Sequence, residues 1–142
     1  MNSSAAIHIV SPAEFDRATA QMPGSERRAA IVPALGIASA IWGRLFEVES
    51  GSQTGIHHHG EQETIAYVLS GILRDSLGRK RRIRLRAKAG DFIHVPAFLP
   101  HIEINLSNQE SFRWVVVREL PGVSMDETSR LYAFASLRTR SA

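Results

Sequence analysis

The sequence predicts an all-β sandwich or barrel formed by a single domain. Six short apolar-rich segments of strand length follow one another from about residue 38, and Gly, Pro or Ser residues separate them. Strands at this close spacing, with turn residues between them, are typical of a sandwich or barrel. No long segment shows the 3.6-residue period of an amphipathic helix before residue 125, and 142 residues is the length of one domain. The predicted strands are residues 38–49, 64–70, 81–86, 91–95, 101–106 and 112–119.

The two ends of the chain predict less regular structure. Ser11 and Pro12 are suited to the N-cap and the first position of a short helix. The segment 124–142 fits either a short helix or an arm that packs on a neighbouring subunit. The large aromatic residues of the predicted strands are expected to lie in the core. These are Trp42, Phe46, Phe92, Phe112 and Trp114.

Composition excludes several classes of function. The chain has no cysteine, so disulfides, thiolate zinc sites, iron–sulfur clusters and cysteine nucleophiles are all excluded. The longest apolar-rich stretch, residues 31–42, is interrupted by Pro33 and Gly36 and is too short to span a bilayer. The N-terminus lacks the basic start and the long apolar run of a signal peptide. We therefore expect a cytoplasmic protein with no membrane partner.

Positive charge is concentrated in one segment. The net charge is +3, but seven of the 17 basic residues lie within residues 79–88, which leaves ten bases against 14 acids elsewhere. Arg82, Arg84 and Arg86 alternate with apolar residues, which predicts a half-buried strand with its arginines in solvent or paired with acids of a partner subunit. Nucleic-acid binding is not expected, because this run contains no aromatic residue.

A cluster of histidines is the first candidate for chemistry. His57 and His59 would share one face of an extended segment while His58 points to the other. Two imidazoles at this spacing can supply two metal ligands, and Glu63 adds a carboxylate after the turn at Gly60. A His-rich polar loop without function is the alternative interpretation of these residues.

A second segment, residues 90–105, supplies another candidate ligand. Pro96 and Pro100 predict a rigid bend that delivers His101 at a fixed position. His94 precedes the bend and is a candidate for the cavity or for supporting a ligand, although a structural histidine is the interpretation that we favour. His101 gains significance because it accompanies the first histidine cluster.

Together the two segments resemble the paired motifs of the cupin family. The first motif is matched by Gly51, His57, His59, Glu63 and Gly71, and the second by Gly90, Pro96, His101 and Asn105. The segment HHHGEQETIAYVLSG also resembles a subgroup of uncharacterised bacterial cupins with a triple histidine. The resemblance implies a jelly-roll barrel of two antiparallel sheets over about residues 35–120 of a single 1–142 domain. A short N-terminal extension and a C-terminal arm or helix would flank the barrel.

Two departures from the family motifs affect the expected site. Phe98 replaces the glycine of the second motif, so the bend is expected to depend on Pro96 and Pro100. Gly71 also lies eight residues after Glu63 instead of seven. Either a bulge brings Glu63 into the site, which is the alternative we favour, or the strand is regular and Thr64 takes the carboxylate position. In the regular case Gln62 could reach the cavity.

The resemblance implies one divalent transition metal, Fe, Mn, Ni, Zn or Cu, held by His57, His59, Glu63 and His101, with Gln62 as the alternative to Glu63. It further implies a small-molecule substrate and a metal-dependent dioxygenase or isomerase. A non-catalytic sensor or carrier and a metal-free structural dimer are the alternatives, because one fold hosts many functions. The apolar stretch 31–42 and the C-terminal segment predict a homodimer.

Overall fold

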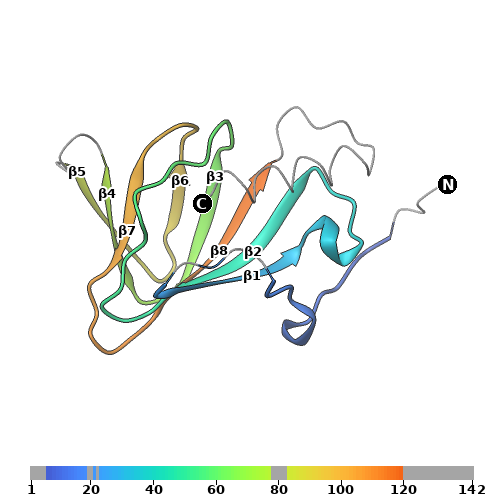
Figure 1. Cartoon of the computed structure of the whole chain (residues 1–142), viewed down its shortest axis with the longest axis horizontal. Helices are drawn as coiled ribbons and strands as arrows, with labels where there is room; N and C mark the ends of the chain where they lie inside the picture. The colour runs from blue at the N-terminus through green and yellow to red at the C-terminus, as the bar shows by residue number, and fades with distance from the viewer. Residues whose placement is uncertain (1–5, 19–20, 22, 78–82, 120–142) are drawn as a thin grey trace.

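The computed structural model describes residues 6–18, 21, 23–77 and 83–119 (Figure 1). This part of the chain contains eight strands and two single-turn 3₁₀ helices. In chain order they are η1 (Pro12–Glu14), β1 (Ser25–Ile31), η2 (Pro33–Leu35), β2 (Ile41–Val48), β3 (Thr64–Ser70), β4 (Ile72–Leu77), β5 (Ile83–Lys88), β6 (Phe92–Val95), β7 (His101–Asn105) and β8 (Phe112–Glu119).

The strands form two antiparallel sheets, which confirms the predicted all-β fold. The larger sheet has the order β1-β2-β8-β3-β6, and the smaller has the order β5-β4-β7. Neighbouring strands such as β2 and β8 are far apart in sequence, so the sheets are joined by crossing connections and not only by hairpins. This arrangement leaves one face of the larger sheet inside the fold and the other outside (Figure 1).

The core lies on the inner face of the larger sheet. Buried and exposed residues alternate along β3 and β8, as the two-residue period of a strand requires. Four of the five aromatic residues that we expected in the core are buried, but Phe92 is 74% exposed. Phe92 pairs with Tyr67 across β6 and β3 and so shares the outer face with it. The buried cluster comprises Ala29, Val32, Trp42, Phe46, Val48, Ala66, Val68, Leu73, Phe112, Trp114 and Val116.

Two strands, β1 and β4, were not expected. In β1, Glu26 and Arg28 point outward and form an ion pair at 3.0 Å, while Arg27 lies against the ring of the core residue Phe46. Because charged residues lie on both faces of β1, its sequence lacks the alternation of apolar and polar residues that predicts a strand. β4 follows β3 directly after Gly71, whose φ of 86° allows the sharp turn between them.

The basic segment differs from its prediction. Leu85 on β5 is 57% exposed, so its side chain is not on a buried face as expected. Ala87, two residues further along the same face, is partly buried against the core, so only part of this face of β5 is covered. Arg84 and Arg86 are also exposed, whereas Arg82 lies outside the described residues, as does the C-terminal segment 124–142.

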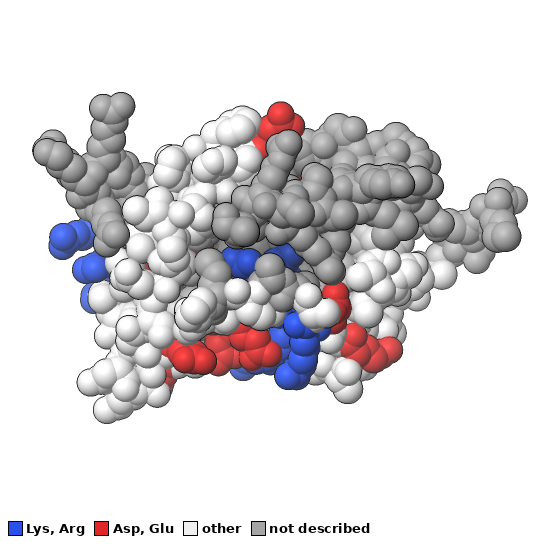
Figure 2. Space-filling model, in the orientation of Figure 1, with Lys and Arg blue, Asp and Glu red and all other residues white. Residues whose placement is uncertain are grey.

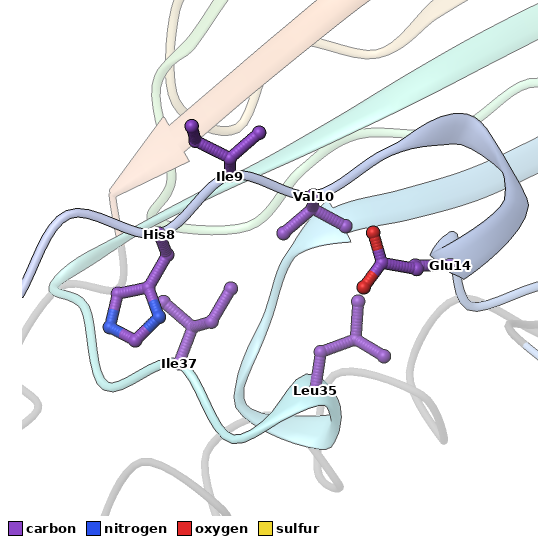
Figure 3. A pocket seen from close by; sticks show the side chains of 6 residues that line it. All are labelled: His8, Ile9, Val10, Glu14, Leu35 and Ile37. Atoms are coloured by element: carbon purple, nitrogen blue, oxygen red, sulfur yellow. The ribbon is translucent and has the colours of Figure 1, made fainter.

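The N-terminal segment packs beside η2. It contains the short helix that the sequence predicted, as the single turn η1. The backbone N–H of Ser11 donates to the Glu14 carboxylate at 2.8 Å, which stabilises the single turn that starts at Pro12. A small pocket of about 180 Å³ lies next to this turn (Figure 3). Because Glu14 is engaged in the turn and aliphatic side chains form most of the rest of the lining, we assign the pocket no chemistry. Its lining residues are His8, Ile9, Val10, Glu14, Leu35 and Ile37. No helix among the described residues is long and apolar enough to cross a membrane.

Candidate metal centre

Three histidines from the two sequence segments meet inside the fold. The backbones of His57 and His101 form an antiparallel bridge, with N–H to carbonyl distances of 3.0 and 2.9 Å. The imidazole ring of His59 lies near both, with ring centroids 5.3 Å from His57 and 4.8 Å from His101. The structure therefore brings together all three histidines that the sequence analysis selected.

A carboxylate that we did not expect completes the cluster. Glu103 follows His101 by two residues on β7, so both side chains lie on the same inward face of the strand. Its carboxylate lies 3.2 Å from Nε2 of His101 and 3.5 Å from Nε2 of His57, and the Thr54 hydroxyl donates to it at 2.6 Å. One ligand atom from each of the three histidines and Glu103 lies within 4.8 Å of the others. Ligands bound to one ion at about 2.0–2.2 Å span a comparable distance.

Backbone carbonyl groups orient two of the imidazole rings. Nδ1 of His57 lies 2.8 Å from the Gly55 carbonyl oxygen, and Nδ1 of His101 lies 2.8 Å from that of Leu99. A carbonyl oxygen only accepts hydrogen bonds, so each Nδ1 carries the proton and the Nε2 of the neutral ring has a lone pair. Both lone pairs would then face the Glu103 carboxylate. This arrangement is repulsive unless a proton or a metal ion lies between them, so the donor set fits a cation.

Without a metal, protons on Nε2 of His57 and His101 would lie between these two rings and the Glu103 carboxylate. Burial by itself would raise the pKa of Glu103, but the hydrogen bonds from His101 and His57 outweigh it and hold the pKa well below its usual value. Glu103 is therefore an anion at neutral pH. An anionic carboxylate beside three imidazoles is a ligand set suited to a first-row divalent ion.

His59 is held neutral by its surroundings. Burial, the Arg118 guanidinium and the other two histidines lower its pKa to about 2. Its Nδ1 lies 2.8 Å from the hydroxyl of Thr64, and that hydroxyl accepts a hydrogen bond from Nε of Arg118 at 2.6 Å. The contact with Thr64 fixes the ring orientation. His59 thus remains in the form that binds metals across the physiological pH range.

The expected role of Glu63 is corrected by the structure. Residues 64, 66 and 68 are buried and residues 65, 67 and 69 are exposed, so this part of β3 is regular. The irregularity in the strand lies between Val68 and Ser70, not near Glu63. The Glu63 side chain is 71% exposed and pairs with His94 at 2.9 Å, outside the histidine cluster. Thr64 therefore takes the inward position that we had assigned to a bulged Glu63.

Gln62 is also outside the cluster, although it is buried. Its side-chain amide donates to the carbonyl oxygen of Glu119 at 2.9 Å and so links the start of β3 to the end of β8. Glu103 was not predicted, because the motif resemblance placed the carboxylate in the first histidine segment. The two-residue spacing from His101 to Glu103, which repeats that of His57 and His59, was the available signal.

Two other motif residues have structural roles. Phe98, which replaces a motif glycine, adopts a left-handed φ of 58°, so the bend is made by this residue as well as by the two prolines. The amide nitrogen of Asn105 lies 3.1, 3.2 and 2.7 Å from the carbonyl oxygens of Val48, Glu49 and Glu110. It connects β7 to the chain after β2 and before β8.

Comparison with known structures shows the same fold. The chain resembles a cupin described as RmlC-like from Shewanella frigidimarina, with a TM-score of 0.62, 13% identity and coverage of 80% of this chain and 91% of that one. It resembles KdgF from Halomonas sp. with a TM-score of 0.61, 16% identity and coverage of 79% and 94%. An S161A mutant of the oxalate decarboxylase OxdC of Bacillus subtilis matches with a TM-score of 0.61, 21% identity and 71% of this chain, which spans 27% of that protein.

No curated protein matches the sequence. A family model does: the one described as "Cupin domain" matches residues 44–118. This match includes both histidine segments and the strand β7, which carries His101 and Glu103. It covers more than half of the chain, and the two-sheet fold agrees with it. The chain therefore belongs to the cupin family.

Proposed function

We propose that this protein binds one divalent transition metal through His57, His59, His101 and Glu103 and acts on a small molecule at that centre. The observation that carries this proposal is the convergence of three imidazoles and one buried carboxylate. Fe, Mn, Ni, Zn and Cu all suit this ligand set. A bound ion of this kind would supply Lewis-acid or redox chemistry of the oxygenase or isomerase type.

The chain's own residues prepare the centre in advance. The carbonyl groups of Gly55 and Leu99 set the orientation of two rings, and Thr64 sets that of the third. The Glu103 carboxylate contributes a negative charge that offsets part of the charge of a divalent ion. Preorganised ligands with supporting hydrogen bonds raise metal affinity, because little reorganisation accompanies binding.

Elemental analysis tests the metal site directly. Protein purified without a His-tag or added metal should contain one equivalent of a transition metal per chain. The double variant His57→Ala/His59→Ala should lose it, whereas His58→Ala should retain it, because the exposed His58 ring accepts a hydrogen bond from Gly60 outside the cluster. A full equivalent of metal in the double variant would place the site elsewhere.

We further propose that a second copy of the chain covers the outer face of the larger sheet. Its apolar side chains pair across neighbouring strands and are 36–74% exposed. Arg28 and Glu47, which pair at 3.0 Å, border the patch with both signs of charge, and this is compatible with a two-fold interface in which the same patch meets itself. The patch consists of Ile65, Tyr67, Phe92, Val115 and Val117.

Light scattering tests this assembly. The wild type should give twice the chain mass of 15.7 kDa, and Tyr67→Glu/Phe92→Ser should give the single mass. Leu85→Ser changes an equally exposed apolar residue on the smaller sheet and should remain dimeric. A wild type of 15.7 kDa at micromolar concentration would rule out the dimer.

A further inference from the structure

The described part of the basic segment forms one edge of the smaller sheet. β5 is the outermost strand in the order β5-β4-β7, and Arg84, Arg86 and Lys88 occupy alternate positions along it. Alternate residues of a strand share one face and are about 6.8 Å apart, so these side chains form a row. Arg74 on β4 pairs in register with Arg86 and extends this basic row into the sheet. The buried Leu73 belongs to the opposite face.

In the described part of the chain, no ion pair neutralises the basic row. The three β5 side chains are exposed, and the ion pairs between described residues involve none of the four members of the row. Arg74 and Arg86 are directly opposite each other, and like charges in this position destabilise a sheet. Nε of Arg74 is also buried and makes no hydrogen bond to a described residue. Figure 2 shows basic atoms at the edge of the molecule where β4 and β5 lie in Figure 1.

The outer backbone edge of β5 is open as well. β5 pairs with β4, and no other strand of the described residues pairs with it. Its last residue is bound to the following turn, because the backbone N–H of Lys88 donates to the Asp91 carboxylate at 2.8 Å. The opposite edge of the sheet differs, since a bridge to His57 covers β7 at His101. Unpaired backbone groups at the edge of a sheet are a template for an additional strand.

An apolar side chain on the other face of β5 is uncovered. Leu85 shares its face with Ala87, which packs against the core, yet Leu85 is 57% exposed. A strand paired with the open edge would place one side chain beside Leu85, at a Cβ distance of about 4.5–5.5 Å. Its preceding and following side chains would lie beside Arg84 and Arg86. The added strand would therefore meet one apolar residue between two positive charges.

The chemistry of this edge selects its partner. The β5 strand of a second copy would bring arginines against arginines, which disfavours that pairing. Single-stranded nucleic acids bind where aromatic side chains stack on their bases, and the basic row contains no aromatic residue. Residues 120–142 carry three arginines and two acidic residues, so their charge does not suit this edge either. An extended peptide with acidic side chains at alternate positions matches both the charges and the open backbone.

We propose that β5 binds an extended acidic segment of a partner protein as an additional strand of the smaller sheet. In this mode of recognition, backbone hydrogen bonds provide affinity and alternate side chains provide specificity. The segment would place Asp or Glu beside Arg84 and Arg86 and an apolar residue beside Leu85. Hydrogen bonds between guanidinium and carboxylate groups are about twice as strong as those between neutral groups. The surface does not include the histidine cluster, so this proposal goes beyond the proposed function and does not depend on it.

Fluorescence anisotropy with a labelled synthetic peptide tests this surface. The probe is a short peptide in which glutamate and valine alternate, titrated with the full-length protein at physiological ionic strength. We expect saturable binding of one peptide per chain, and no binding of a peptide in which lysine and valine alternate. Arg86→Glu should weaken binding of the acidic peptide by about tenfold or more. Arg17→Glu is the matched control, because it makes the same change in a side chain that is 65% exposed outside the smaller sheet, and it should leave affinity within about twofold.

A modified probe separates an added strand from simple charge attraction. The same acidic peptide, N-methylated at every residue, keeps its carboxylates but has no backbone N–H group to donate. It should bind about tenfold more weakly or worse. Thermal unfolding of each variant shows that a loss of binding is not a loss of the fold. The proposal is overturned if the folded wild type does not bind the acidic peptide, if N-methylation or Arg86→Glu leaves affinity unchanged, or if a thymidine oligonucleotide binds more tightly than the peptide.

Discussion

Replacing Glu103 by glutamine should weaken metal binding by about 100-fold or more. The substitution keeps the shape of the side chain but removes its negative charge. Loss of a group that only supports a metal ligand usually weakens affinity by about 10–100-fold, and loss of a ligand should exceed that. A 100-fold change corresponds to about 2.8 kcal/mol of binding free energy. Glu103 is 7% exposed, so water cannot readily reach this position and compensate for the lost carboxylate.

The matched control is Glu63→Gln, the same change in a residue that the structure places outside the cluster. Its carboxylate is exposed and pairs with His94, so metal affinity should stay within about twofold of wild type, as expected for an exposed ion pair. Both affinities can be measured by competition with a chelator of known strength, after thermal unfolding shows that the metal-free variants fold. If Glu63→Gln weakens binding and Glu103→Gln does not, our assignment of the carboxylate is wrong.

Three further predictions concern groups around the site and the fold. Thr64→Val removes the hydroxyl that orients His59, and the same competition assay should show affinity about 10–100-fold lower. Gly71→Ala places a Cβ 2.9 Å from a carbonyl oxygen in a backbone with a φ of +86°, so urea unfolding should show a free energy of unfolding lower by about 2–3 kcal/mol. Gly36 also has a left-handed φ but has open space around it. Gly36→Ala should therefore lower the free energy of unfolding by only about 1 kcal/mol. In metal-free protein the folded-state pKa of His59 is about 2 and its ordinary value is 6.5. The unfolded state therefore takes up the proton first on acidification, and stability should fall by up to about 2 kcal/mol between about pH 7 and 5; a rise in stability over this range would contradict the burial of His59.

The three histidines could be predicted because the signal for them is local. The spacing of His57 and His59 places both rings on one face, and the prolines around His101 fix its position after a bend. The strand pattern was equally local wherever one face was apolar, as in β3 and β8. It failed for β1, because Arg27 points inward against an aromatic ring and breaks the apolar alternation on that face.

The carboxylate could not be placed in the same way. Whether residue 63, 64 or 103 reaches the histidines depends on how β3, β7 and the segment before β3 are aligned in space. The bridge between His57 and His101 and the hydrogen bond between Thr54 and Glu103 determine that alignment, and both join residues more than 40 positions apart.

The electrostatics of β3 explain why a carboxylate on β7 suits this chain. The inward position at the start of β3 holds Thr64, whose hydroxyl accepts a hydrogen bond from Arg118 at 2.6 Å. A carboxylate at that position would pair with the guanidinium group, and its charge would be shared between Arg118 and any metal ion. Glu103 lies on another strand, where its neighbours are Thr54 and two imidazoles. Its charge is therefore available to the metal centre and is not shared with Arg118.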